Sequence, residues 1–204
     1  MRKKISAMLV VSIVLAGAYT SNALAQTAVT AQAADRATPL GAIEYFFTQL
    51  QAANFSGLPD AQQLERLAPL LDADLVTLIR RAQQVEQACA RVTPAGDKPH
   101  MIEGELFSGS NEGYTEVAYA QAQTKGQRAK LALHFIYTDT RFPAAHHFRN
   151  VVWPAEAQLR RDPAHSSWLL QDLKFEQGRG LRRDLHDFIA AAKRYCQVQT
   201  PGSQ

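Results

Sequence analysis

The residue with the clearest capacity for chemistry is Asp172, a carboxylate inside the largely apolar run 167–176. Burial raises the pKa of a carboxyl group toward the range that a general acid or base needs. Such a group could serve an isomerase or a cyclase. More often, a lone buried carboxylate caps the N-terminus of a helix or pairs with a nearby arginine, here Arg182 or Arg183.

His134 and Tyr137 are the other candidates for acid–base chemistry. Side chains alternate between the two faces of a strand, so residues three apart point to opposite sides. The two are therefore not expected to form a direct pair in one groove, and a lone strand histidine is more often a satisfied polar residue. If the protein is an enzyme, Asp172, Tyr137 and His134 are the residues that could carry catalysis.

Two close pairs of titratable residues also invite a functional interpretation. Glu103 and Glu105 would share one face of a strand and could act as an acid–base pair, although such pairs more often form a solvated face. His146 and His147 point to opposite sides of an extended segment and have no flanking ligand, so we expect no metal site. The sequence has no nucleophile elbow and no phosphate-binding loop, and we expect no cofactor.

Aromatic residues offer a different role, in binding. Trp153 and Trp168 could pack in the core or at a sheet edge, or could present a ring for stacking. Together with Tyr137 and Asp172 they are the candidate binding residues. The partner would be a small apolar or amphipathic ligand, or another protein.

The N-terminus reads as an export signal. Basic residues at 2–4 precede an apolar run over 5–19, and Ala23–Ala25 ends just before Gln26. This pattern is typical of a cleaved signal peptide, because a membrane-spanning helix needs about 20 apolar residues. No cysteine lies at the cleavage site, so we expect no lipid anchor there, and Arg2 has no neighbouring arginine, so the segment is not a twin-arginine signal. We expect a periplasmic or secreted protein with no membrane anchor after cleavage.

Removal of residues 1–25 from the 204-residue chain leaves 179 residues, a length that suits one domain. The signal holds three of the 22 basic residues and none of the 19 acidic ones, so the mature chain carries 19 of each. This balance gives no electrostatic footprint for nucleic acid or for a membrane surface. We expect a disordered leader at 26–37, one domain at 38–196 and a flexible tail at 197–204.

Apolar periodicity predicts three helices and then a final one. Thr38 and Pro39 begin the first, Asp60 the second and Asp72 the third, and the last covers 181–196. Cys89 and Cys196 each lie on the apolar stripe of a helix. In an oxidising compartment paired thiols usually become a disulfide, so we expect a bond between the third helix and the last.

Between these helices the period changes to two, which predicts antiparallel strands. Pro154 cannot donate to a ladder and should lie at an edge or a bulge. The order of helices, strands and helix predicts an α+β domain whose sheet curls over the helices. The expected strands are 114–123, 128–138, 151–160 and 167–176, with a hairpin loop at 124–127 joining the first two.

Several short segments resemble an uncharacterised exported bacterial branch of the nuclear-transport-factor-two-like, or cystatin-like, superfamily. They are Trp168–Phe175 with Gly178 and Leu181–Leu185, and Gly104–Ser108 with Glu112–Gly113. The resemblance covers most of 38–190. It implies N-terminal helices packed in a strongly curved antiparallel sheet, a cystatin-like cone, with a C-terminal helix. Some relatives use the cone pocket for acid–base catalysis and others for binding.

The resemblance itself implies no activity. Our leading hypothesis is an exported, non-enzymatic binding or interaction protein, for example an immunity or envelope-stress factor. The alternative is an acid–base enzyme of isomerase or cyclase type that uses a pocket in the cone.

Overall fold

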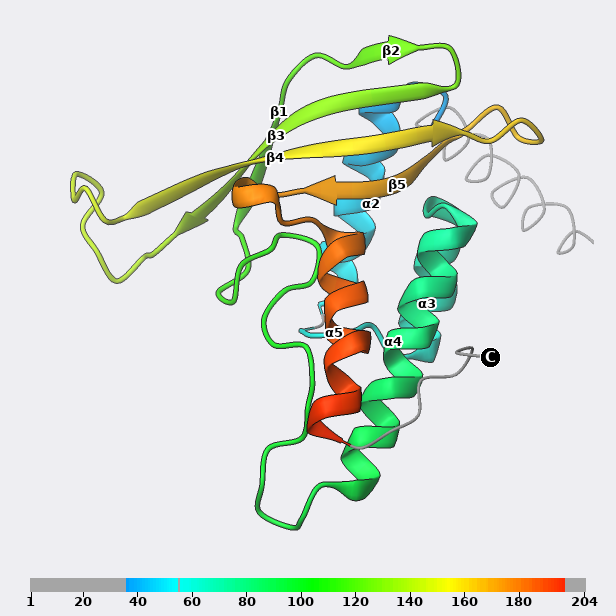
Figure 1. The fold of residues 1–204 in the computed structure, drawn as a ribbon. Helices are drawn as coiled ribbons and strands as arrows, with labels where there is room; N and C mark the ends of the chain where they lie inside the picture. Colours follow the sequence, from blue (N-terminus) through cyan, green and yellow to red (C-terminus); the bar gives the residue numbers. More distant parts are fainter. Residues whose placement is uncertain (1–35, 55, 197–204) are drawn as a thin grey trace, which may run out of the picture. The chain divides into compact units, whose positions relative to one another are not determined.

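The computed structural model describes residues 36–54 and 56–196, which belong to one compact unit (Figure 1). The predicted signal peptide, most of the predicted leader and the predicted tail lie outside these residues. Within the described part, the chain forms four α-helices and five strands in a single antiparallel sheet that does not close. The α+β prediction is therefore confirmed.

The helices begin where the polar caps of the sequence place them. The side chains of Thr38, Asp60 and Asp72 each accept a hydrogen bond from a backbone N–H of the following first turn, at 3.0, 2.7 and 3.1 Å. None of the helices in the described ranges is long and apolar enough to cross a membrane. The helices are α2 (Pro39–Ala53), α3 (Ala61–Leu67) with the 3-10 turn η1 (Ala68–Leu70), α4 (Ala73–Val92) and α5 (Leu181–Tyr195).

A disulfide joins α4 to the end of α5. The Sγ atoms of Cys89 and Cys196 lie 2.01 Å apart, and both residues are buried. Each cysteine lies on the buried stripe of its helix, which also carries Leu78 and Val85 on α4 and Leu185 on α5. The predicted pairing is confirmed.

The sheet has the order β1-β3-β4-β5, with β2 also paired to β3. The expected strand 114–123 is instead two short strands, and the expected loop 124–127 is a two-residue turn at Gly126–Gln127. Gly126 has φ +59°, a conformation that glycine adopts without steric cost. The strands are β1 (Glu116–Tyr119), β2 (Gln123–Lys125), β3 (Arg128–Thr138), β4 (Asn150–Arg161) and β5 (Trp168–Lys174).

Helices cover one face of the sheet (Figure 1). Aromatic rings fill the interface between them. Phe46 and Phe47 of α2 are buried, and the ring of Phe47 meets that of Phe135 on β3 edge-to-face at 5.5 Å. Phe107 comes from the segment before β1 and packs on Phe46 at 5.2 Å. The contact between α2 and the sheet is therefore a buried aromatic core.

The other face of the sheet is polar. Lys130 Nζ lies 3.0 Å from Glu156 Oε1, and Lys174 Nζ lies 2.6 Å from Asp172 Oδ2. Glu156 is directly opposite Lys174 in the β4–β5 register, so these charges form a continuous ladder across three strands. This face of the sheet is therefore suited to contact with solvent.

Candidate interaction surface on the β3–β4 hairpin

Asp172 of β5 lies beside the N-terminus of α5, where it has a structural role. Its Oδ1 accepts hydrogen bonds from the backbone N–H groups of Leu173 at 2.9 Å and Arg182 at 3.0 Å, and its Oδ2 pairs with Lys174. The interpretation of Asp172 as a helix cap is confirmed. Its ion-pair partner is Lys174 of the same strand, whereas Arg182 contributes its backbone.

The three residues of the acid–base hypothesis do not meet in one groove. His134 is exposed on the outer face of the sheet opposite Pro154, while Tyr137 is half-buried opposite Val151. Asp172 lies two strands from His134, beside Gln158. The candidates are therefore distributed along the sheet.

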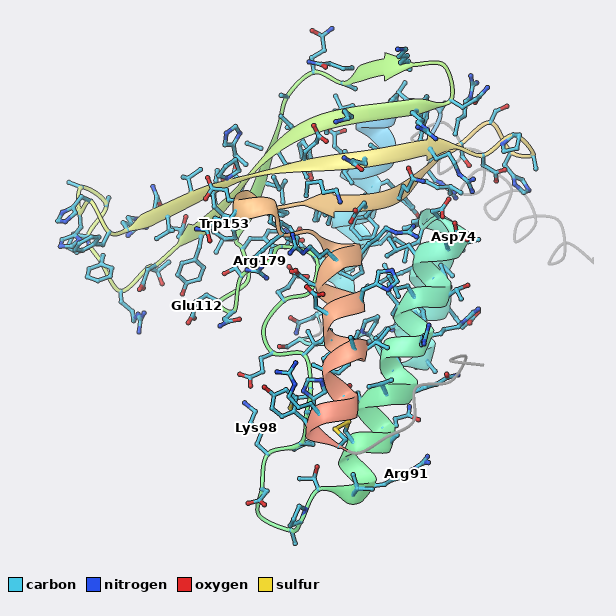
Figure 2. The ribbon with its side chains drawn as sticks, viewed as in Figure 1. Asp74, Arg91, Lys98, Glu112, Trp153 and Arg179 are labelled. Carbon is cyan, nitrogen blue, oxygen red and sulfur yellow. A yellow bond between two sulfur atoms is a disulfide. The ribbon has the colours of Figure 1, made fainter. Side chains whose placement is uncertain are left out.

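The two tryptophans have different environments. Trp168 is only 5% exposed and belongs to the core. Trp153 is half-buried, stacks on Phe135 with ring centroids 5.6 Å apart, and donates from Nε1 to the carbonyl of Ser108 at 2.9 Å. Trp153 lies where the β3–β4 hairpin leaves the rest of the fold (Figure 2).

The prediction that Glu103 and Glu105 share a strand face is wrong, because the segment is a loop in the structure. Glu103 is exposed and pairs with Lys98 at 2.7 Å, whereas the Glu105 carboxyl group turns inward. Sequence spacing could not show this difference, since it depends on how the loop folds over α2.

The premise that His146 and His147 point to opposite sides is also wrong. Consecutive turns replace the expected extended segment, with hydrogen bonds from the N–H of His146 to the carbonyl of Pro143 and from the N–H of Arg149 to that of His146. The two imidazole rings consequently stack, 4.9 Å apart at 17°. No group of three or more metal-ligating side chains occurs in the described part of the chain.

One region departs from the ordinary pattern of the sheet. We call it the distal hairpin: the outer ends of β3 (136–138) and β4 (150–152) with the loop 139–149 between them. Strand β5 pairs with β4 only from Glu156 to Arg161, so the hairpin extends well beyond it (Figure 1). The distal hairpin is thus an arm that projects beyond β5, with the start of β1 still bonded to β3 at its base.

Apolar side chains on this arm face solvent. Phe148, Val151 and Val152 are 61%, 52% and 55% exposed. Val151 and Val152 are neighbours in a strand, so they occupy opposite faces. Strands that are apolar on both faces are normally buried on both. The residues of the arm are therefore typical of a strand that is buried on both faces, yet in this structure they are exposed to solvent.

The outer edge of β4 is also open. Backbone hydrogen bonds at Asp139–Arg149 and Gln127–Arg161 show that the odd-numbered residues of β4 bond to β3. Asn150 and Val152 therefore direct their N–H and C=O groups away from β3, and no described strand pairs with them. Pro154 lies at this same edge, which confirms the predicted position.

Hydrogen bonds and ring contacts join the residues at the tip of the arm. Asp139 accepts hydrogen bonds from Arg141 Nε at 2.9 Å and from its terminal nitrogen at 2.6 Å, and Arg149 donates to the carbonyl of Phe142. The contact with Arg141 lowers the pKa of Asp139 to about 2. The rings of Phe142, His146 and His147 stack in series at 4.5 and 4.9 Å, and Phe148 contacts His147 at 3.9 Å with its ring tilted by 46°.

No family model matches this chain, and neither the comparison with curated proteins nor that with solved structures finds a match. The candidate surface is therefore inferred from the geometry of the distal hairpin alone. The sequence does contain a signal for it: Val151, Val152 and Trp153 interrupt the alternation of β4, and Phe148 precedes them in a loop. Alternation over the rest of β4 obscured this interruption.

Proposed function

We propose that this chain is an exported, non-enzymatic interaction protein that binds a partner protein through the distal hairpin. The partner adds a β-strand to the open edge of β4 and covers the apolar side chains of the arm. The observation that carries this proposal is the coincidence of an unpaired strand edge at 150–155 with exposed Phe148, Val151 and Val152.

Strand addition suits this edge because main-chain hydrogen bonds give affinity while alternate side chains give specificity. Exposed strand edges are hazards that proteins usually shorten, charge or cover. Here Pro154 blunts one position only, and the outward backbone groups of Asn150 and Val152 remain available. The rigid tip lowers the entropy cost of binding, since its rings are already ordered.

The charge ladder on the outer sheet face gives less support to a partner bound there. Its charges already pair with one another, as in Lys130 with Glu156 and Lys174 with Asp172. Asp172 has three partners, which also weakens the acid–base alternative. Export rests on the predicted signal peptide, and an immunity or envelope-stress role would fit a protein partner in that compartment.

Photo-crosslinking in cells that express the full-length chain tests the proposal. A benzophenone amino acid at Phe148 should crosslink one discrete protein, and the same group at exposed Gln87 on α4 should not. Equal labelling from both positions would argue against a specific surface on the arm.

Substitutions at Val152 separate backbone pairing from apolar contact. Val152→Pro removes an N–H that points away from β3, so it should leave the β3–β4 ladder intact and reduce crosslinking at least tenfold. Val152→Thr keeps the N–H and should reduce it less. If Val152→Pro crosslinks as well as the unaltered chain, the partner does not pair with this edge.

A further inference from the structure

The tip of the distal hairpin contains a hydrogen bond that requires a neutral histidine. The half-buried ring of His146 accepts at Nδ1 from the backbone N–H of Phe148, with the two nitrogens 3.3 Å apart. An imidazole nitrogen accepts a hydrogen bond only while it carries no proton. The contact therefore identifies His146 as the neutral tautomer, with its proton on Nε2.

Two rings stack on that of His146. The Phe142 ring lies 4.5 Å away at 12°, and the His147 ring lies 4.9 Å away at 17°. Stacking on Phe142 is compatible with both protonation states, because an aromatic face attracts a cation. Stacking on His147 is not, because two protonated imidazoles would place like charges beside each other. Protonation of both histidines therefore opposes the second stack and not the first.

The charged groups around the tip do not neutralise an added proton. They are Tyr137 of β3, Glu112 of the loop before β1, and Asp139, Arg141 and Arg149 of the tip itself. The carboxylate of Asp139 already pairs with Arg141. Among the described residues, His165 is the only histidine in an ion pair with a carboxylate. A proton on His146 or His147 therefore has no described carboxylate as its partner.

We propose that the tip is a pH-sensitive switch, in which protonation of His146 at Nδ1 breaks its hydrogen bond with Phe148 and weakens partner binding by the distal hairpin. The second step rests on the proposed function. The added proton turns an acceptor into a donor, so two N–H groups then face each other. The backbone of Phe148 moves away, and its exposed ring moves with it. Imidazole changes its charge between about pH 5 and 8, so the bond is present at the upper end of this range and absent at the lower end.

The opposite side of the tip should stay folded through this range. The pKa of Asp139 is about 2, because Arg141 donates hydrogen bonds to its carboxylate. Their contact therefore persists far below neutral pH. The switch is local to 146–148 and does not require the arm to unfold.

NMR of the exported chain, with its disulfide intact and without a partner, tests the switch. As the pH falls from about 7.5 to about 5.5, the amide resonance of Phe148 should move with the same midpoint as the ring resonances of His146. The amide of Arg141, which donates to Asp139, should not move.

Two substitutions assign this titration to its source. His146→Asn keeps an acceptor oxygen in place of Nδ1 but cannot gain a proton, so the Phe148 amide should become independent of pH. His165→Asn is the matched control, because His165 is an exposed histidine in the turn after β4 and should leave the Phe148 titration unchanged.

Photo-crosslinking tests the effect on the partner. With the benzophenone group at Val151, the yield of crosslinked partner in cell extract should fall at least fivefold between about pH 7.5 and about pH 5.5. In the His146→Asn variant, the yield should be the same at both pH values.

Each result decides one step. A Phe148 amide that does not follow the His146 ring, or that still titrates in His146→Asn, would overturn the switch. A constant crosslinking yield while the amide moves would overturn the effect on binding and leave the proposed function intact. No crosslinked partner at either pH would overturn the proposed function together with the effect on binding, and the NMR titration alone would then decide the switch.

Discussion

The two halves of the β3–β4 hairpin are made of the same strands in one register, yet they follow different rules. In the proximal half, residues 128–135 and 153–161, one face is buried and the other carries paired charges. In the distal hairpin β4 instead exposes an apolar side chain on each face, Val151 on one and Val152 on the other. The proximal half therefore fixes the register and contributes stability, which leaves the distal half free to carry a surface that folding does not require.

The largest loss of stability is expected from a substitution that creates a cavity in the proximal half. Phe135 is fully buried, and its ring contacts those of Phe47, Tyr114 and Trp153. Phe135→Ala should lower the free energy of unfolding by about 3 to 5 kcal/mol, because the lost contacts leave a cavity that rigid neighbours cannot fill. Urea denaturation measures it. A loss below about 1 kcal/mol would mean that the core tolerates the gap and that the two halves differ less than we infer.

A smaller loss is expected at β5, the strand that pairs with the proximal half of β4. Asp172→Asn keeps the shape of the side chain and an oxygen that can accept from the N–H of Arg182, but it removes the charge that pairs with Lys174 and faces the N-terminus of α5. The free energy of unfolding should fall by about 1 to 3 kcal/mol, and crosslinking from Phe148 should persist in the folded molecules. An unchanged Tm together with a lost turnover or phenotype would instead support the acid–base hypothesis.

The conformation of the tip should depend on pH in a defined window. The folded-state pKa of Asp139 is about 2, below the value of about 3.9 expected when the chain is unfolded. The contribution of the Asp139–Arg141 contact is therefore complete above about pH 4 and is lost as the pH falls through about 2. The amide resonances of 139–149 should follow this loss. Arg141→Ala should move the midpoint upward toward 4, and an unmoved midpoint would show that Arg141 does not set it.

The smallest effect on stability is expected at the tip. Phe148→Ala removes an exposed ring and should change the free energy of unfolding by less than about 0.5 kcal/mol. When the crosslinking group is placed at Val151, Phe148→Ala should nevertheless reduce the yield of crosslinked partner at least tenfold. If Phe148→Ala destabilises the domain as much as Phe135→Ala, the distal hairpin is part of the core and the contrast between the halves disappears.

Local chemistry made much of the fold predictable. The caps at Thr38, Asp60 and Asp72 satisfy backbone donors within a few residues, so the sequence alone locates the helix starts. Alternation places the bounds of β3 at 128 and 138, as the structure has them.

The candidate sites depended on contacts that spacing does not encode. Glu105 is buried because Gly104 turns its loop over α2, and the imidazole rings stack because Asp139 and Arg141 fold the tip. Such contacts depend on tertiary placement, which periodicity cannot specify. The Lys174 partner of Asp172, by contrast, lies two residues further along the same strand, so the spacing of β5 could have indicated it.

The disulfide can form only after the C-terminal helix of the chain has been synthesised. Cys89 and Cys196 are 107 positions apart, and all five strands lie between them in sequence. Synthesis runs from the N-terminus, so the thiol of Cys89 waits through the whole sheet before its partner is made. A chain that stops before α5 lacks Cys196, the only other cysteine of the sequence, and keeps the thiol of Cys89 unpaired. Formation of this disulfide thus indicates that α5 has been synthesised and lies beside α4.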